Sequence, residues 1–335
     1  MKHHFSDVLD RDGDHWTVVP NGERFAYQFH DIEEGDPNIE VVTIGKTTPQ
    51  WQKCLRLPRL AEVTLHEASV EQLEAICECT SIKRLRISHL RPMTIESLSK
   101  LVQLEELVLE YVSGFSDLSP LSRLPNLRSL HLENLRRVSD FQGLSGCSSL
   151  RYLSIFGTLD WNQPIDNFEF LRGLKKLEQL GFAFVTSARA YPAFLPAKAL
   201  KNLKAIKLPS NYFATQEYAL LSVILDGVTG ANWGAYRRVG LQQMALPGND
   251  PRRKLSADEI RKHHPEICIT YKGRWEISDP AHEWFEFTGK RAGRVKCTHP
   301  ESAKRCAEAE DRFEAMKIEA RAMLDALSPA DDVGM

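Results

Sequence analysis

The sequence lacks long apolar runs and has little net charge. No stretch of about 18 apolar residues occurs, the length that a helix needs to cross a bilayer, so a transmembrane helix is excluded. The 335 residues carry a formal net charge of -2, without the basic excess that favours binding to nucleic acid phosphates. We therefore expect neither a membrane nor a nucleic acid partner.

The chain also lacks an apolar leader and a regular set of cysteines. Residues 1–16 are polar and rich in aspartate, unlike a secretory signal, and Lys2 stands where myristoylation requires glycine. The seven cysteines are odd in number and irregularly spaced, which is typical of reduced thiols. We expect a cytoplasmic protein, with export by a non-classical route left open.

Common motifs of enzymes and metal sites are likewise missing. The sequence contains no phosphate-binding loop, no nucleophile elbow and no His-Glu-x-x-His pair. Cys77 and Cys79 lack a second pair at ligand spacing, so the apolar end of a turn explains them better than zinc does. The sequence predicts no catalytic residue, no cofactor and no metal site.

What the sequence does have is a pattern, L-x-x-L-x-L, that returns every 22 to 27 residues. This period predicts a solenoid, because one repeat cannot bury its apolar face alone and stacks on its neighbours. A degenerate capping strand is expected over residues 39–45. The seven repeats begin at Leu60, Ile82, Leu104, Leu127, Leu150, Leu177 and Leu203.

Each repeat divides into a short strand and a return segment. Alternate strand side chains point to opposite faces, so residues such as Leu107 and Leu109 should enter the core. Asp117–Leu121 predicts a 3₁₀-like turn, and residues 71–77 and 94–100 predict one or two helical turns. The longer fifth and sixth repeats predict loops or ridges at an edge, over residues 161–167 and 186–196.

These repeats resemble the leucine-rich repeat superfamily, and the Asp117–Leu121 turn resembles its bacterial short-repeat, internalin-type branch. The resemblance implies an α/β fold, a curved parallel sheet with a short 3₁₀ or helical convex side. The superfamily usually has asparagine at the ninth repeat position, but here only Asn211 fits, so we expect other partners for the backbone and irregular curvature. Internalins are secreted adhesins, and adhesion is not inferred without a signal sequence.

The sequence divides into three parts: residues 1–38 as an irregular N-terminal cap, 39–211 as the solenoid, and 212–335 as a mixed α/β capping region. In the last part we expect a helix over residues 215–225 and a glycine-punctuated loop over 227–240. A second helix should begin near Ser256 and Glu259, which fit a capping box. A strand over residues 267–271 and an amphipathic helix over residues 301–327 should follow.

The outward strand positions are the expected binding surface. Aromatic anchors among charged neighbours are typical of protein interfaces, and the glutamates favour a basic partner. Alternatively, the aromatics pack under the loop around Trp161 or against the C-terminal region. The candidate partner-binding residues are Glu106, Glu110, Tyr111, His131, Glu133, Tyr152, Phe156 and Phe184.

The sequence thus favours a non-enzymatic, monomeric interaction protein, either an immunity or antitoxin-like inhibitor or a signalling scaffold. A second hypothesis is a bacterial effector with a thiol-dependent enzyme in residues 212–335, using Cys268, Cys297 or Cys306 as a low-pKa nucleophile. A third is self-association through the helix over residues 301–327.

Overall fold

The computed structural model describes residues 9–12, 15–18, 38–264, 266–269 and 275–327. The chain folds into two compact units. The first comprises Met1–Tyr212 and Leu221–Ala231, and the second comprises Phe213–Leu220 and Asn232–Met335. The expected N-terminal cap, residues 1–38, lies mostly outside the described residues.

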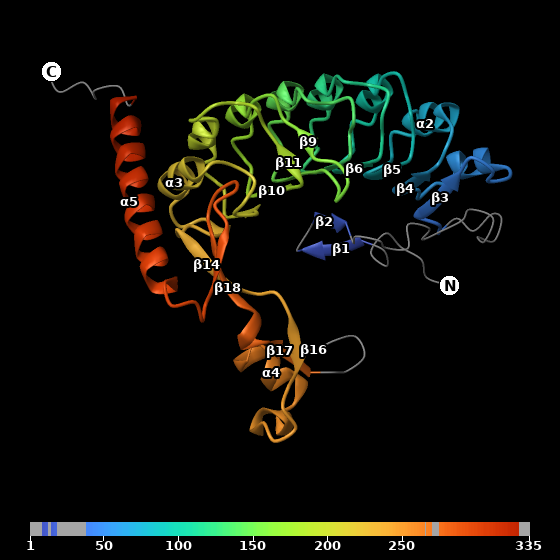
Figure 1. Cartoon of the computed structure of the whole chain (residues 1–335). Helices are drawn as coiled ribbons and strands as arrows, with labels where there is room; N and C mark the ends of the chain where they lie inside the picture. The colour runs from blue at the N-terminus through green and yellow to red at the C-terminus, as the bar shows by residue number, and fades with distance from the viewer. Residues whose placement is uncertain (1–8, 13–14, 19–37, 265, 270–274, 328–335) are drawn as a thin grey trace, which may run out of the picture. The chain divides into compact units, whose positions relative to one another are not determined.

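A nine-stranded parallel sheet forms the first unit (Figure 1), and its strands follow one another in chain order. Neighbouring strands from β3 to β10 pair in register without a shift. The predicted curved parallel sheet is therefore confirmed. Its strands are β3 (Val41–Gly45), β4 (Glu62–His66), β5 (Arg84–Ser88), β6 (Glu106–Glu110), β7 (Ser129–Glu133), β8 (Tyr152–Phe156), β10 (Gln179–Ala183), β12 (Ala205–Leu208) and β13 (Thr229–Ala231).

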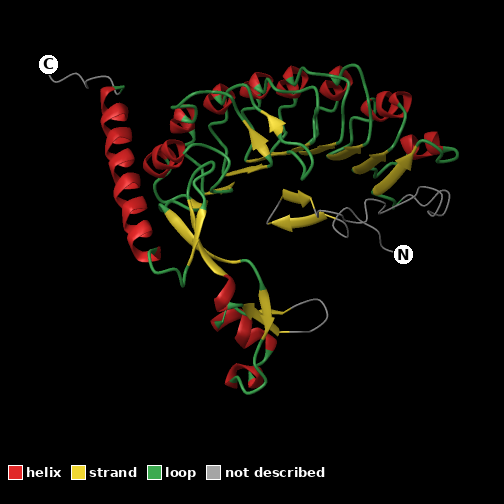
Figure 2. Ribbon diagram, viewed as in Figure 1, coloured by secondary structure: helices red, strands yellow, loops and turns green. Residues whose placement is uncertain are grey.

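Short helices line the convex side of this sheet (Figure 2). The turn expected at Asp117–Leu121 is confirmed, because the Ser119 N–H donates to Asp117 Oδ1 at 2.8 Å and a 3₁₀ helix follows. The same aspartate or asparagine turn precedes the helices of the next two repeats. The convex helices are η2 (Trp51–Arg56), α2 (Val70–Cys77), η3 (Glu96–Lys100), η4 (Ser119–Arg123), η5 (Gln142–Gly146), η6 (Glu169–Gly173) and η7 (Leu195–Ala199).

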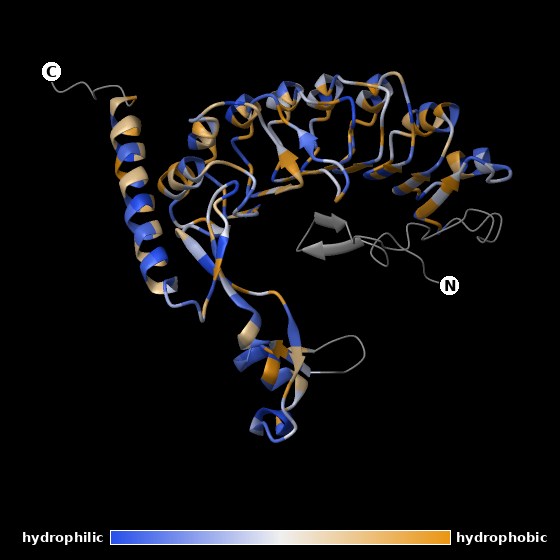
Figure 3. Ribbon diagram, in the orientation of Figure 1, coloured by the Kyte–Doolittle hydropathy of each residue, from blue (hydrophilic) through white to orange (hydrophobic). Residues whose placement is uncertain are grey.

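The core lies between the sheet and these helices. Leu107 and Leu109 are buried as expected, and Figure 3 shows apolar and polar residues mixed along the strands and short helices, which each have one face in the core. Most of the ninth repeat positions, such as Leu90 and Val112, are buried apolar residues that replace the usual asparagine. A core contact thus takes the place of an amide.

The backbone around the ninth position finds other partners, as expected from the sequence. The His89 N–H donates to the Glu110 carbonyl at 3.0 Å, which continues the sheet ladder by one residue. Gln163 supplies an amide further along: its Oε1 accepts from the Leu135 N–H at 3.0 Å, and its Nε2 donates to the Val138 carbonyl at 2.6 Å.

Two features of the first unit differ from the sequence expectations. The loop expected over residues 227–240 begins instead with strand β13, which extends the sheet past Asn211; a side chain at Gly230 would lie 2.9 Å from the Ile206 carbonyl oxygen, so only glycine fits there. The expected edge loops contain two short parallel strands, β9 (Gln163–Pro164) and β11 (Val185–Thr186). The N-terminal part also has a hairpin, β1 (Leu9–Asp12) and β2 (His15–Val18), whose second strand lies beside β7.

The second unit holds two three-stranded antiparallel sheets. The predicted helices are confirmed as α3, α4 and α5, and Ser256 and Glu259 form the capping box of α4. Within the described residues, no helix combines the length and apolarity needed to cross a bilayer. The elements are α3 (Thr215–Ile224), which starts in this unit, β14 (Tyr236–Gly240), β15 (Gln243–Ala245), η8 (Pro251–Lys254), α4 (Ala257–His263), β16 (Cys268–Ile269), β17 (Trp275–Ser278), η9 (Pro280–His282), β18 (Glu283–Phe287), β19 (Arg294–Lys296) and α5 (Ser302–Ala326).

Candidate functional site

The concave face of the solenoid is organised in rows. In-register parallel pairing places equivalent repeat positions side by side on neighbouring strands. Side chains in such a row interact directly, with attraction between opposite charges and repulsion between like charges. From β4 to β8, the third repeat position places in one row Glu62, Arg84, Glu106, Ser129 and Tyr152.

Opposite charges alternate along this row and pair with one another. The Arg84 guanidinium donates to Glu62 and, at 3.4 Å, to Glu106. Arg128, at the start of the next repeat, donates to the same Glu106 oxygen at 3.1 Å. Burial alone lowers the pKa of Arg84, but Glu62 and Glu106 outweigh it, so the net shift is upward. Together with Arg128, the charged members of the row form a self-neutralised charge ladder: Glu62, Arg84, Glu106 and Arg128.

A second pair lies deeper on the concave face. Arg86 donates from Nε at 2.9 Å and from Nη2 at 2.7 Å to Glu110 Oε2. The side chains of Arg86 and Glu110 are 1% and 0% exposed. Burying two charges carries a large desolvation cost that only close pairing offsets. These groups are thus paired with each other and closed to solvent, not open to a partner.

The structure separates the eight predicted binding residues into two groups. Buried residues occur at several positions along the strands, including the first and last residues of β6, and partly exposed ones lie at or just beyond the carboxyl ends of the strands. The buried group is Glu106, Glu110, His131 and Tyr152. The partly exposed group is Tyr111, Glu133, Phe156 and Phe184.

Rings gather along the carboxyl edge of the sheet. The exposed His89 ring stacks on Tyr111, with centroids 4.8 Å apart and planes 5° apart. Phe156 meets His131 edge-on at 5.1 Å, and Phe184 lies 6.4 Å from the next ring along. We call the rings with solvent access the aromatic edge: His89, Tyr111, Phe156, Phe184 and Tyr212.

Backbone conformation at the eighth repeat position contributes to this edge. His89, Tyr111 and Phe184 have φ values of 56°, 53° and 50°, in the left-handed region that side chains other than glycine and asparagine seldom adopt. Each follows its strand directly, so the turn places the ring at the strand's end. Sequence reasoning identified Tyr111 and Phe184 but not His89 as an anchor, although the three residues occupy the same repeat position.

One apolar residue beside the edge was not predicted from the sequence. Leu159 is 87% exposed, in the loop that follows β8. Thr158 and Trp161 bridge the base of this loop, and the Trp161 ring lies under the Arg136 guanidinium, 5.8 Å from its centroid. The insertion after Phe156 was the sequence signal for this loop; a single exposed leucine is by itself common on protein surfaces.

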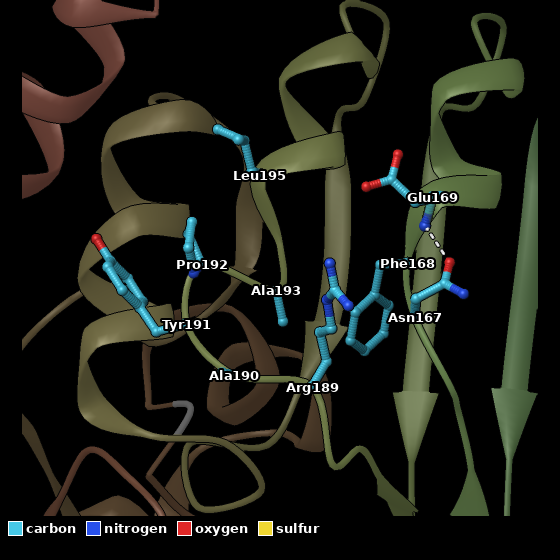
Figure 4. Close-up of a pocket in the computed structure, with 9 residues that line it drawn as sticks. All are labelled: Asn167, Phe168, Glu169, Arg189, Ala190, Tyr191, Pro192, Ala193 and Leu195. Atoms are coloured by element: carbon cyan, nitrogen blue, oxygen red, sulfur yellow. Dashed lines mark hydrogen bonds between the residues drawn. The ribbon is translucent and has the colours of Figure 1, made fainter.

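A separate pocket lies on the loop side of η6 and η7 (Figure 4). It has a volume of about 310 Å³, and Asn167 at its rim accepts the Glu169 N–H at 2.9 Å. Figure 4 shows the Arg189 side chain beside the Phe168 ring, while the Tyr191 ring projects away from Phe168. The residues that line this pocket include no Ser, Cys or His nucleophile or base. Its lining residues are Asn167, Phe168, Glu169, Arg189, Ala190, Tyr191, Pro192, Ala193 and Leu195.

The three cysteines proposed for thiol chemistry differ in environment. Cys268 is exposed, Cys297 is half-buried and Cys306 is buried. Burial raises the pKa of Cys306, opposite to what a thiolate nucleophile needs. Burial also raises the pKa of the convex-side thiols Cys54 and Cys147 to about 12.

The described residues hold one group of three side chains with donor atoms close enough for a metal ion: Glu110, His131 and Glu133. All three were predicted as partner contacts rather than ligands. They come from adjacent strands β6 and β7, where Glu110 lies directly opposite Glu133 in the register.

Comparison with known proteins gives similarity of fold. An internalin from Listeria monocytogenes, inlF, is 17% identical over 58% of this chain and 54% of its own, with a TM-score of 0.44. Internalin C2 of the same organism is 22% identical over 50% of this chain and 71% of its own, with a TM-score of 0.40. A Leptospira interrogans leucine-rich repeat protein is 13% identical over 58% of this chain and 66% of its own, with a TM-score of 0.32. This chain thus spans about half of the first internalin.

No protein-family model matches the chain, and a search of curated proteins returned no match. The class of protein therefore follows from the chain's own geometry: in-register parallel strands every 22 to 27 residues, each returning through a short helix. That geometry is a parallel-sheet solenoid. With L-x-x-L-x-L on its strands and 3₁₀ turns on its convex side, the first unit is a leucine-rich repeat solenoid.

Proposed function

We propose that this chain is a non-enzymatic protein-binding module that recognises a protein partner along the aromatic edge. The observation that carries the proposal is the run of solvent-accessible rings at the carboxyl ends of neighbouring strands, with the exposed Leu159 beside it. Large rigid rings and apolar anchors supply most of the energy of protein interfaces. The middle of the concave face has its charges already paired, so the edge is the better contact surface.

Burial divides the roles of the predicted residues. Tyr111, Phe156 and Phe184 are proposed as anchors, and Glu133 as the acidic neighbour that favours a basic rim on the partner. The buried group around Glu106 is proposed to hold the strands that present them. We expect the module to act as a cytoplasmic monomer, without a nucleic acid or membrane partner.

The edge suits either an inhibitor or a scaffold, and binding behaviour distinguishes them. An immunity-type inhibitor should form a 1:1 complex that abolishes the partner's activity. A scaffold should leave that activity intact and bind a second protein at the same time. An activity assay of the purified partner with one equivalent of this chain separates the two.

Capture with tagged full-length protein tests the binding proposal, followed by calorimetry with the purified partner. The variant Tyr111→Ala/Phe156→Ala should lose the partner that the wild type retains. Met93→Ala is a matched control, because Met93 is 80% exposed but lies before η3 on the convex side. Equal retention by all three proteins, with unchanged unfolding temperatures, would place the contact elsewhere.

The thiol-enzyme alternative has its own test. Native protein is treated with a thiol probe across a pH series, and labelled cysteines are mapped by mass spectrometry. We expect the buried Cys306 to stay protected from the probe at neutral pH. Rapid labelling of Cys297 or Cys306 at neutral pH would instead favour an enzyme in the second unit.

A further inference from the structure

Glu110, His131 and Glu133 place three donor atoms within 4.8 Å of one another on the concave face. The His131 Nε2 atom lies 3.5 Å from Glu133 Oε2. The spacing follows from the sheet: Glu110 and Glu133 are cross-strand neighbours, and His131 points to the same face two residues earlier on β7. Two zinc ligands at their usual bond lengths stand about 3.3 Å apart in a tetrahedral site.

Two residues of this group each have a buried polar atom that makes no hydrogen bond. Among the described residues, neither Glu110 Oε1 nor His131 Nε2 has a hydrogen-bond partner, and the two residues are 0% and 5% exposed. A buried polar atom without a partner is costly and calls for an unobserved water, proton or ion. Both atoms belong to residues of the same group of three.

Arg86 supports the group from outside. It holds Glu110 Oε2 with two hydrogen bonds, so the carboxylate is fixed with Oε1 left over for another partner. Groups that orient a metal ligand in this way are a regular feature of metal sites. The guanidinium also offsets one of the two carboxylate charges, so the group of four has a net charge of -1 when His131 is neutral.

We propose that Glu110, His131 and Glu133 bind a divalent zinc ion, with the fourth coordination position open. One imidazole and two carboxylates fit zinc, whereas calcium and magnesium prefer shells made of oxygen alone. Water would take the open position. The zinc proposal does not depend on the protein-binding function. The sequence pattern predicted no metal site, so it did not indicate this one.

Calorimetric titration of the EDTA-dialysed full-length chain with ZnCl₂ tests this site. Wild-type protein should bind one more equivalent than Glu133→Gln, or bind its tightest equivalent on the order of 10- to 100-fold more tightly. His131→Gln should show the same loss. His263→Gln is the control, since its histidine lies on α4 in the second unit, and it should retain the wild-type titration.

Cobalt(II) gives a second readout, because a tetrahedral site with a histidine ligand produces a strong visible absorption band. That band should appear with wild type and with His263→Gln and vanish with Glu133→Gln. The substitution changes few atoms, and circular dichroism of the variant tests whether it is folded. Zinc binding that is absent from the wild type, or equal in wild type and both site variants, overturns the proposal.

Discussion

Replacing Arg86 by methionine should destabilise the solenoid far more than replacing Arg86 and Glu110 together by methionine. Methionine keeps the apolar stem of Arg86 but leaves the Glu110 carboxylate, 0% exposed, without its cation. Breaking one side of a buried ion pair costs roughly 3–5 kcal/mol, whereas exchanging both sides for apolar residues is often neutral or stabilising. The double variant also removes two polar atoms, Arg86 Nη1 and Glu110 Oε1, that have no partner in the described structure.

The assay is urea unfolding followed by circular dichroism, with EDTA present so that no metal contributes. Arg59→Met is the control, because the Arg59 side chain is 57% exposed in its pair with Glu40, and such surface pairs contribute only about 0–1 kcal/mol. If Arg86→Met lowers the free energy of unfolding no more than Arg59→Met does, the Arg86–Glu110 pair is not buried as described. If the double variant is as unstable as the single one, the unpaired carboxylate is not the cause.

Two further predictions concern packing and pH. Gly173→Ala should lower the free energy of unfolding by about 1–3 kcal/mol or more, since its Cβ would lie 1.8 Å from the Ser145 carbonyl oxygen; Gly248→Ala, with nothing within 4 Å, should be near neutral in the same urea experiment. A hydrogen bond from the Arg252 side chain lowers the pKa of Asp250 from 3.8 to about 2. Because the pKa of Asp250 is lower in the folded state, its carboxylate stabilises the fold fully above pH 3.8, and this stabilisation is lost as the pH falls toward 2. NMR of the Asp250 carboxyl carbon should show a titration midpoint near that folded pKa, and Arg252→Ala should move the midpoint back toward 3.8.

Apolar periodicity was enough to predict the strands. Each L-x-x-L-x-L segment from Leu60 to Leu203 became a strand of one parallel sheet, since the period reports which side chains must be buried. The capping box at Ser256 was enough to predict the start of α4, because its hydrogen bonds join residues only three apart in the sequence. Strand β13 was not predicted from the sequence, because Thr229–Ala231 carries no leucine pattern and is held by hydrogen bonds to a distant part of the chain.

The candidate site was predictable only in part. The sequence showed that Glu106 and Glu110 face outward, but not that they are buried, nor that Arg84 pairs with Glu106 and Arg86 with Glu110. Pairing depends on which strands are neighbours and on how far each side chain reaches across them, and neither is local to one repeat. The exposure of Leu159 depends on the fold of an insertion, which has no repeat to compare with.

The charge ladder also limits how this protein can change its length. Loss of residues 82–103 would remove one whole repeat without disturbing the leucine frame, which is how solenoids shorten in the course of gene rearrangement. It would, however, set Glu62 beside Glu106, where like charges repel, and leave Glu110 buried without Arg86. The leucines make the repeats equivalent, but the charges make each one specific to its place, so a shortened descendant would need compensating substitutions.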